Sequence, residues 1–300
     1  MTDASASALP VTDADAIAPA RDKVKDGFAR LRRNRLAVAG LYIFGFIVLA
    51  CVIGPWFIPF DPETQDYSAI SNGPSLTGGH WFGTDDLGRD LLVRLLLGGR
   101  TSLAIGILAA IVAVVIGTGY GAISGFFGGM VDQFMMRTID VLYGLPFLFF
   151  IIMLTLLFGR GMLVLLLAFG SLAWLTIAVI VRGQTLSLKQ RDFIEAARAG
   201  GMKPMRIVRR HIVPNTIGPV IVYASLLVPE VIIGESFLSY LGLGVQEPMA
   251  SWGTLIDAGT AAMDTEPYQL LFPGGALALT LFSLNFIADG LRDAFDPKDR

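Results

Sequence analysis

Side chains capable of chemistry are sparse in this 300-residue chain, and the most distinctive group lies in a charged stretch between two long apolar segments. The group combines a carboxylate, small residues, a glycine and a basic end, at Glu195, Ala196, Ala197, Gly201, His211 and Pro214. The two alanines leave a flat patch that a partner protein can approach closely, and Glu195 offers that partner a carboxylate. A solvated basic loop is the plainer alternative, because runs of charge usually form solvated faces.

The sequence contains no set of residues that fits a catalytic, cofactor-binding or metal site. The phosphate-binding pattern Gly-x-x-x-x-Gly-Lys-(Ser/Thr) does not occur, so the chain cannot house ATP chemistry. His80 and His211 fall in loops predicted on opposite sides of a membrane, and Cys51 is the only cysteine, which excludes an internal disulfide. The basic runs lack interleaved aromatic residues, which argues against nucleic-acid binding.

The local sequence of the charged stretch predicts two helices with a bend between them. Ser187 and Gln190 fit a capping box, so a helix should begin near Leu188. This helix should end at Gly200-Gly201, where glycine relieves the strain of a left-handed helix C-terminus. Pro204 suits the first turn of a second short helix. We therefore expect the stretch to stand out from the apolar segments as a bent surface element.

The composition indicates a membrane protein with an all-α, polytopic fold. Hydrophobic residues make up 54% of the chain and charged residues 16%, against about 25% charged in an ordinary soluble domain. Uncharged runs near the ~20 residues that a spanning helix needs predict six transmembrane helices. They lie at Leu36–Ile58, Thr101–Val131, Val141–Gly159, Gly161–Val181, Ile212–Gly234 and Leu270–Ala288. Because only Gly159-Arg160-Gly161 separates the third from the fourth, these two should form a tight helical hairpin.

The distribution of Lys and Arg predicts that both termini lie in the cytoplasm. The leader before the first apolar run carries seven such residues, and residues 182–210 carry eight. The segment 236–269 carries none, so it belongs on the outer side. Residues 1–20 are too polar to bury a core and are expected to be disordered.

Two further patterns suggest how the helices pack. Glycines recur every fourth residue at Gly117, Gly121, Gly125 and Gly129, a spacing that lets helices approach closely in lipid. Packing within this chain is the preferred interpretation, and contact across a subunit interface is the alternative. The segment Leu87–Gly99 is interpreted as an amphipathic helix at the membrane interface, with an (i, i+4) ion pair between Asp90 and Arg94.

The charged stretch resembles the EAA loop of ATP-binding-cassette importer permeases, in which Glu-Ala-Ala, three residues and Gly precede a proline-terminated motif. The chain departs from the general Ile-x-Leu-Pro ending at His211 and Val213, and its form resembles the peptide-transporter branch. Further stretches share that resemblance: Gly83–Asp90, Val181–Gln184, Ser239–Gly244, Ser251–Gly253 and Asp289–Pro297. The similarity runs from about Arg30 to Arg300 and is nearest to the C-type permease subunits of oligopeptide importers, with dipeptide permeases as near relatives.

This resemblance implies a type I importer permease fold in the inner membrane. Residues 1–35 would form a disordered, basic cytoplasmic segment, and residues 36–300 a permease domain with its coupling loop at about 182–214. The implied partners are a homologous second permease, two cytoplasmic cassette ATPases, an extracytoplasmic peptide-binding protein and membrane lipid, with peptide as the substrate. Because the ATPases would hydrolyse ATP, the chain itself would not be an enzyme. Oligopeptide, dipeptide, glutathione and metal-chelate cargoes all stay open.

Two acids near the fifth predicted span, Glu230 and Glu235, are candidates for a substrate pathway. Ionisable groups at membrane depth usually face a water-filled route, so one of them could meet a peptide's amino group. The alternative is that both are simply hydrated at the outer interface. A secondary transporter driven by ions is the main alternative function, and it would call for inverted repeats and paired midplane carboxylates, neither of which is evident. A membrane anchor or sensor is a further possibility, but it would leave the bent loop unexplained.

Overall fold

A computed structural model describes residues 20–76 and 79–295, and within these ranges the chain is helical apart from turns and one isolated bridge between Thr84 and Asp90. The helices in chain order are α1 (Ala20–Leu31), α2 (Arg35–Ile53), η2 (Gly54–Phe57), α3 (Leu91–Phe127), α4 (Gly129–Tyr143), α5 (Phe147–Phe158), α6 (Met162–Leu188), α7 (Asp192–Ala199), α8 (Pro204–Ile207), η3 (Val208–Ile212), α9 (Val213–Tyr240), α10 (Trp252–Ala261) and α11 (Tyr268–Phe295). The prediction of an all-α polytopic fold is confirmed.

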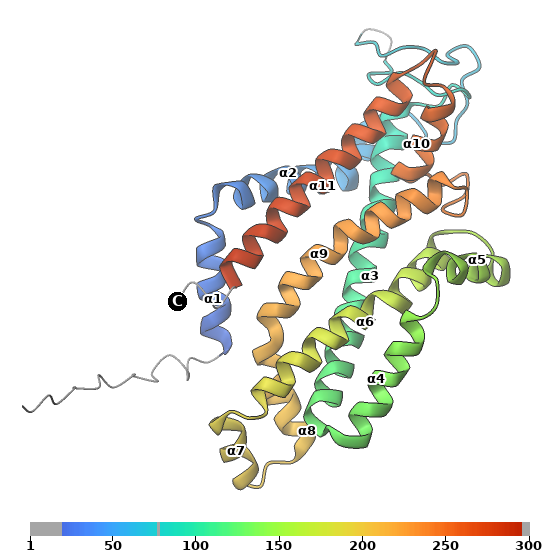
Figure 1. The fold of residues 1–300 in the computed structure, drawn as a ribbon. Coiled ribbons are helices and arrows are strands. Elements are labelled where there is room, and N and C mark those ends of the chain that lie inside the picture. The colour runs from blue at the N-terminus through green and yellow to red at the C-terminus, as the bar shows by residue number, and fades with distance from the viewer. Residues whose placement is uncertain (1–19, 77–78, 296–300) are drawn as a thin grey trace, which may run out of the picture.

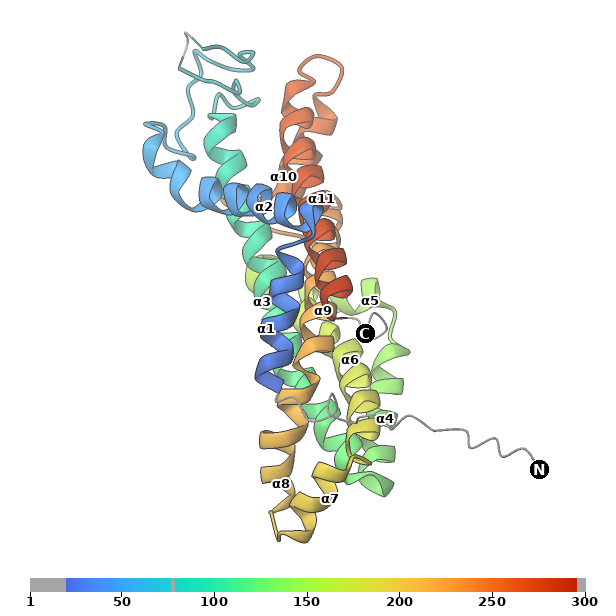
Figure 2. The same ribbon diagram turned by 90° about the vertical axis from the view of Figure 1, so that its left-hand side faces the viewer.

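The helices form an elongated bundle in which α3, α6 and α9 run along the long axis (Figure 1). Helices α7 and α8 lie at one end of this axis, whereas α10 and the segment 58–90 lie at the other. The view turned by 90° shows the same separation of the two ends (Figure 2). The charged loop is therefore far from the segment after α9, which contains no Lys or Arg. This separation agrees with the prediction that the two lie on opposite sides of a membrane.

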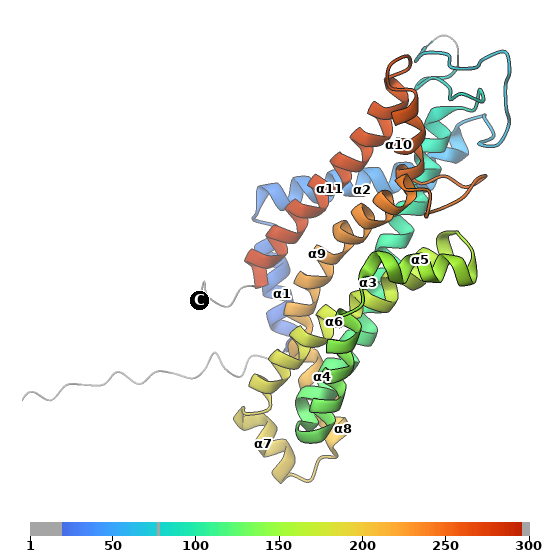
Figure 3. The ribbon, with the colours of Figure 1, turned by 45° about the vertical axis from the view of Figure 1, so that its right-hand side comes forward.

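Five helical segments are long and apolar enough to cross a membrane: Arg35–Phe57, Leu91–Phe127, Met162–Leu188, Pro204–Tyr240 and Tyr268–Phe295. The third predicted span, Val141–Gly159, is not one straight helix. It falls on α4 and α5, which meet at an angle of 83°, and α5 projects sideways from the bundle (Figure 3). Pro146 forces the residue before it out of the helical region, which explains the break. The tight turn before α6 is confirmed, since α5 ends at Phe158 and α6 begins at Met162.

Helix α3 begins ten residues earlier than the predicted span, and this overturns the prediction of a separate interfacial helix at Leu87–Gly99. Asp90 caps its N-terminus by accepting a hydrogen bond from the Val93 amide at 2.9 Å. The predicted ion pair between Asp90 and Arg94 is also wrong. Asp90 pairs instead with His80 at 2.8 Å, and the Arg94 guanidinium turns to Asp85 at 2.7 Å.

Part of the segment predicted to be disordered has regular structure. Helix α1 begins at Ala20, and Phe28 packs edge-on against Phe295 at the end of α11, with ring centroids 6.2 Å apart. Residues 1–19, the rest of that prediction, lie outside the described residues.

The glycine stripe packs α3 against α6 within the chain, as predicted for three of its four members. A Cβ atom at Gly121 would lie 2.2 Å from the carbonyl oxygen of Ala178. A Cβ atom at Gly117 or Gly125 would likewise meet the backbone of α6 at 2.7 and 2.8 Å. Gly129 does not belong to the contact, because it begins α4 and has open space around it.

Gly121→Leu is expected to lower the amount of folded protein in the membrane. A branched side chain at this position forces α3 and α6 apart, and such overpacking costs typically about 1–3 kcal/mol. The measurement is the yield of detergent-extracted protein. Gly119→Leu is the matched control, since Gly119 lies on the same helix with no atom within 4 Å of an added Cβ. Equal yields for the two variants would contradict the close contact.

Candidate functional site

Helix α7 presents the Glu-Ala-Ala segment at the end of the bundle (Figure 1). Ile194 is fully buried and anchors the helix, and Ala197 packs against the same core. Glu195 and Ala196 are exposed beside them. The result is a short amphipathic helix whose outer face carries the carboxylate and a small residue.

The predicted capping box at Ser187 does not form. Helix α6 continues through Ser187 to Leu188, and the Lys189 amide donates to the Thr185 carbonyl at 2.9 Å. A residue inside a helix cannot cap the next one, so α7 begins four residues later than predicted, at Asp192. Helix α6 extends beyond the predicted end of its span at Val181, and the residues of the predicted capping box fall within or just after this extension.

The glycine bend after α7 is confirmed in detail. Gly201 has φ of +72°, the Gly201 amide donates to Arg198 O at 2.9 Å, and the Met202 amide donates to Ala197 O at 3.1 Å. These two bonds make a Schellman motif, which satisfies the last carbonyls of the helix and reverses the chain. An added Cβ at Gly201 would meet no atom within 4 Å, so the requirement for glycine comes from the backbone angle and not from crowding.

After the bend, the chain enters one continuous helical rod. Pro204 begins α8 as predicted, but this helix is not separate from the fifth span. A π-helical turn, η3, carries it into α9, with the Val213 amide donating to Val208 O. Pro214 lacks an amide hydrogen and crowds the preceding turn, and a widened turn accommodates it. The segment Pro204–Tyr240 therefore reaches from the bend to the opposite end of the bundle.

His211 and Pro214 shape this rod from within. The His211 ring lies beside Phe193 of α7, with centroids 6.3 Å apart, and the Asn215 side chain donates to His211 O at 2.7 Å. Buried Nε2 of His211 has no hydrogen-bond partner within the described part of the chain. The six predicted coupling residues therefore divide into an exposed pair, Glu195 and Ala196, and four that build the bend and its support.

The loop is fastened to α3 and α4 by contacts that sequence reasoning missed. The Arg182 guanidinium makes two hydrogen bonds to the Asp132 carboxylate, at 2.5 and 2.6 Å. Lys189 Nζ donates to Gly125 O at 3.0 Å, and the Arg198 guanidinium lies 5.1 Å from the centre of the Phe126 ring. The Val-Arg-Gly-Gln motif at 181–184 was the available signal, but it did not identify the partner acid.

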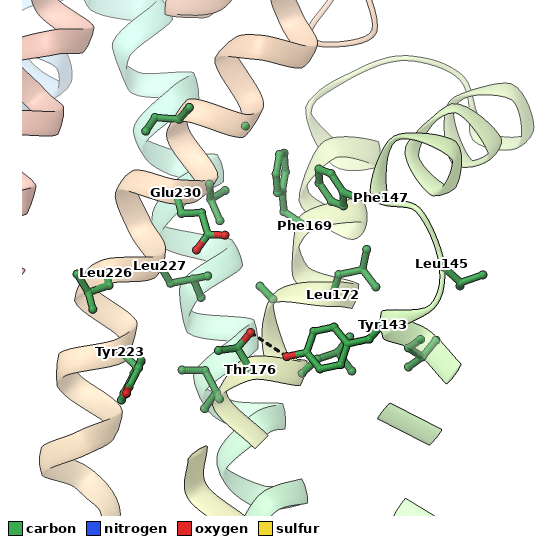
Figure 4. A pocket seen from close by; sticks show the side chains of 17 residues that line it. Tyr143, Leu145, Phe147, Phe169, Leu172, Thr176, Tyr223, Leu226, Leu227 and Glu230 are labelled. Carbon is green, nitrogen blue, oxygen red and sulfur yellow. Dashed lines mark hydrogen bonds between the residues drawn. The ribbon is translucent and has the colours of Figure 1, made fainter. Parts of the chain in front are cut away.

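A pocket of about 650 Å³ opens between the α4–α5 connection, α6 and α9 (Figure 4). Its walls are mostly apolar, and among the described residues that line it Glu230 is the only acidic or basic one. The Glu230 carboxylate points from α9 into this space. On the other side, the Tyr143 and Thr176 hydroxyls lie 3.1 Å apart in a hydrogen bond. Glu230 is thus an exposed acid that lines the pocket, and its role in a substrate pathway stays a prediction.

Glu235, the second predicted pathway acid, does not line this pocket. Its side chain is fully buried and accepts hydrogen bonds from the Ser102 and Ser239 hydroxyls, both at 2.7 Å. Ser102 Oγ in turn accepts from the Trp252 amide at 3.2 Å. Glu235 therefore joins α3, α9 and α10 and does not face solvent, and Trp252 is itself buried, with 1% exposure.

An ion-pair network fastens the segment 58–90 to the loop after α9. Arg94 bridges Asp85 at 2.7 Å and Glu247 at 3.3 Å, and Arg89 contacts the same two acids. Burial disfavours the charged form of Arg89, but its hydrogen bonds to Asp85 and Glu247 and their charges outweigh this and raise its pKa. Arg89 therefore stays charged, and the network stabilises the end of the bundle opposite α7.

Comparison with known proteins shows matches along nearly the whole chain. The model of the binding-protein-dependent transport system inner membrane component matches residues 117–300, and that of the N-terminal TM domain of oligopeptide transport permease C matches residues 24–74. The oligopeptide transport system permease protein OppC of Haemophilus influenzae is 49% identical, with 100% of both chains covered. The Escherichia coli OppC is 53% identical, covering 92% of this chain and 91% of its own. The dipeptide transport system permease protein DppC of Bacillus subtilis is 42% identical, covering 94% and 88%.

Proposed function

The chain belongs to the family of binding-protein-dependent transport system inner membrane components, and we propose that its bent loop transmits the closure of a partner ATPase to a peptide passage. It is a multi-pass inner-membrane permease subunit of an ATP-binding-cassette importer of peptides. Its role is to form part of the translocation pathway, while chemical energy enters from ATP hydrolysed by partner subunits.

One observation carries the proposed coupling role. The Gly201 bend leads directly into the helical rod Pro204–Tyr240, which passes the Glu230 pocket and ends beside the Glu235 junction. A force applied to the exposed face of α7 therefore reaches the pocket through a single rigid element. Rigid helices with two discrete packings are the usual carriers of such coupling.

The proposed residues have distinct roles. Glu195 and Ala196 meet the ATPase surface, while Ala197 and Gly201 set the angle of α7. His211 and Pro214 form the π-helical turn and the start of α9, where the helical rod Pro204–Tyr240 leaves the bend. Glu230 lines the passage, and Glu235 fastens the outer ends of the helices.

The proposed partners are a homologous second permease, two cytoplasmic cassette ATPases and an extracytoplasmic peptide-binding protein. The exposed apolar side chains of α5 and α3 fit contact with lipid and with the second permease. Reconstitution tests the assignment: proteoliposomes holding all the subunits should import peptide only with ATP inside and loaded binding protein outside. Uptake that follows an ion gradient without ATP would overturn it in favour of a secondary transporter.

The geometry of the described residues does not favour that alternative. Paired carboxylates at membrane depth would be its signature, but Glu230 and Glu235 have separate surroundings, one in a pocket and one among serine hydroxyls.

Cysteine labelling is expected to place the end of the bundle that carries α7 in the cytoplasm and the opposite end outside. In a Cys51→Ala background, Leu76→Cys and Thr260→Cys should react with an impermeant thiol reagent added to intact cells, because both positions are exposed at the end of the bundle opposite α7. Ser187→Cys, also exposed, should react only after the cells are opened. Labelling of Ser187→Cys from outside would refute the orientation.

A further inference from the structure

The pocket beside Glu230 contains a carboxylate without a partner. Glu230 makes no hydrogen bond or ion pair within the part of the chain that the structure describes. Its neighbours in the wall are mainly leucine, isoleucine, valine and aromatic side chains. Glu230 is exposed in this chain and therefore open to a charged ligand, and acids inside membrane proteins usually mark a route for ions or substrate.

We propose that this pocket is a binding subsite for an ammonium group of the peptide in transit. The inference rests on the proposed role as a peptide permease and adds the chemistry that the passage recognises. The ammonium group pairs with the Glu230 carboxylate, and the adjoining residue of the peptide fills the apolar part of the pocket. The pocket thus orients the cargo on its way past α9.

The shape and lining of the pocket fit this ligand. Its volume of about 650 Å³ lies within the range of roughly 300–1,000 Å³ that is typical of small-ligand sites. Phe147 and Phe169 lie together on the wall facing Glu230, with ring centroids 5.3 Å apart, and aromatic faces attract cations as well as apolar groups. The Tyr143 and Thr176 hydroxyls are placed to exchange hydrogen bonds with a peptide amide.

Two sources supply the same ammonium chemistry: the amino terminus of the peptide and a lysine side chain. The amino terminus is the better candidate, because every unblocked peptide has one and the site would then serve cargo of varied sequence. Probe peptides distinguish these sources. One has a free amino terminus and no lysine, a second is N-acetylated without lysine, and a third is N-acetylated with one lysine.

The test is photo-cross-linking in the complete transporter, which bypasses the selectivity of the binding protein. Each probe peptide carries a photoreactive phenylalanine beside its amino terminus, and is added to the full complex in lipid discs without binding protein. Cross-links are mapped by mass spectrometry. The free-amine peptide is expected to label the Phe147–Phe169 wall about tenfold more than the acetylated peptide, since a charge-assisted hydrogen bond is lost on acetylation.

Glu230→Gln should remove this preference, reducing the yield for the free-amine peptide to that of the acetylated one. Glu63→Gln is the matched control, because Glu63 is an exposed acid in the segment before α3, and this variant should keep the preference for the free-amine peptide. Strong labelling by the lysine peptide alone would overturn the assignment to the amino terminus. Equal labelling by all three peptides in the wild-type complex would overturn the proposed subsite. This outcome does not depend on whether the Glu230→Gln variant folds. ATP-driven uptake by the same wild-type complex separates the two proposals, because it tests the permease function without reference to Glu230.

Discussion

Gly201→Val is expected to weaken attachment of the partner ATPase by about tenfold, or to uncouple its hydrolysis from uptake, while the membrane spans stay inserted. Valine has a side chain that strongly disfavours φ of +72°, and forcing a non-glycine residue into the left-handed region costs roughly 1–2 kcal/mol. Because no atom stands near an added Cβ, the cost is met by reorienting α7 and not by a clash. The exposed face that carries Glu195 then points in the wrong direction.

Substitutions at neighbouring positions separate this cause from a general loss of folding. Gly201→Asn should be milder than valine, because asparagine tolerates the left-handed region. Gly200→Ala should be milder still, since Gly200 has an ordinary φ of −74°. Glu195→Lys leaves the bend intact but reverses the charge at the proposed ATPase surface, so it should resemble Gly201→Val in coupling.

Purified complexes would be compared for retained ATPase subunit, hydrolysis stimulated by binding protein, and peptide uptake. Coupling is reciprocal, so where ATP and loaded binding protein stabilise the same permease state, each should lose its enhancement of the other's binding. If both Gly201→Val and Glu195→Lys keep wild-type peptide uptake and wild-type stimulation of hydrolysis, the coupling role is wrong. The loop is then a solvated basic connection.

Glu235→Leu is expected to destabilise the chain by about 1–3 kcal/mol and to loosen α10. The buried carboxylate accepts hydrogen bonds from Ser102 of α3 and Ser239 of α9, and Ser102 also accepts from the Trp252 amide at the start of α10. Leucine removes the common acceptor, and a buried polar group left unsatisfied costs roughly that amount. Gly253 packs its backbone against Ser236 of α9, so α10 has little room to find new partners.

Thermal unfolding of the purified complex measures this loss, and the reactivity of a cysteine at Thr260 measures the mobility of α10. Glu230→Leu is the matched control for stability, because it removes an acid five residues earlier on the same helix that has no partner among the described residues. If the two leucine variants unfold at the same temperature, the junction around Glu235 does not hold these helices together.

Much of the framework was predictable because it depends on residues close together in the sequence. Long apolar runs identified five spanning segments, since every backbone polar group in lipid must be satisfied within its own helix. The bend at Gly201 and the helix start at Pro204 were predictable for the same local reason, because each follows from the allowed backbone angles of one residue type. The glycine spacing indicated a close helix contact for three of its four members.

Helix ends were harder to place, because a neighbouring segment can extend or break a helix. The capping box predicted at Ser187 does not form, because α6 continues through that residue. The apolar run at Val141–Gly159 is not one helix, because it breaks at Pro146. The leucine-rich segment before Thr101 looked interfacial by composition. In the fold, however, its residues are buried in the first turns of α3.

The surroundings of the acidic residues were decided by the tertiary structure. By sequence, Glu230 and Glu235 are two similar acids five residues apart near the end of one apolar run. The fold turns one toward a pocket created by the α4–α5 bend, and the other toward a serine 133 residues away in the chain. Arg94 likewise pairs with Asp85 and with Glu247, which is 153 residues away in the chain. It does not pair with Asp90, the partner that helical spacing suggested. The sequence by itself determined five apolar helices long enough to cross a membrane and the bend at Gly201, because lipid and backbone angles act locally. Which charges face water, which are buried and which meet one another depended on how the helices pack, because those contacts join residues that no local pattern relates.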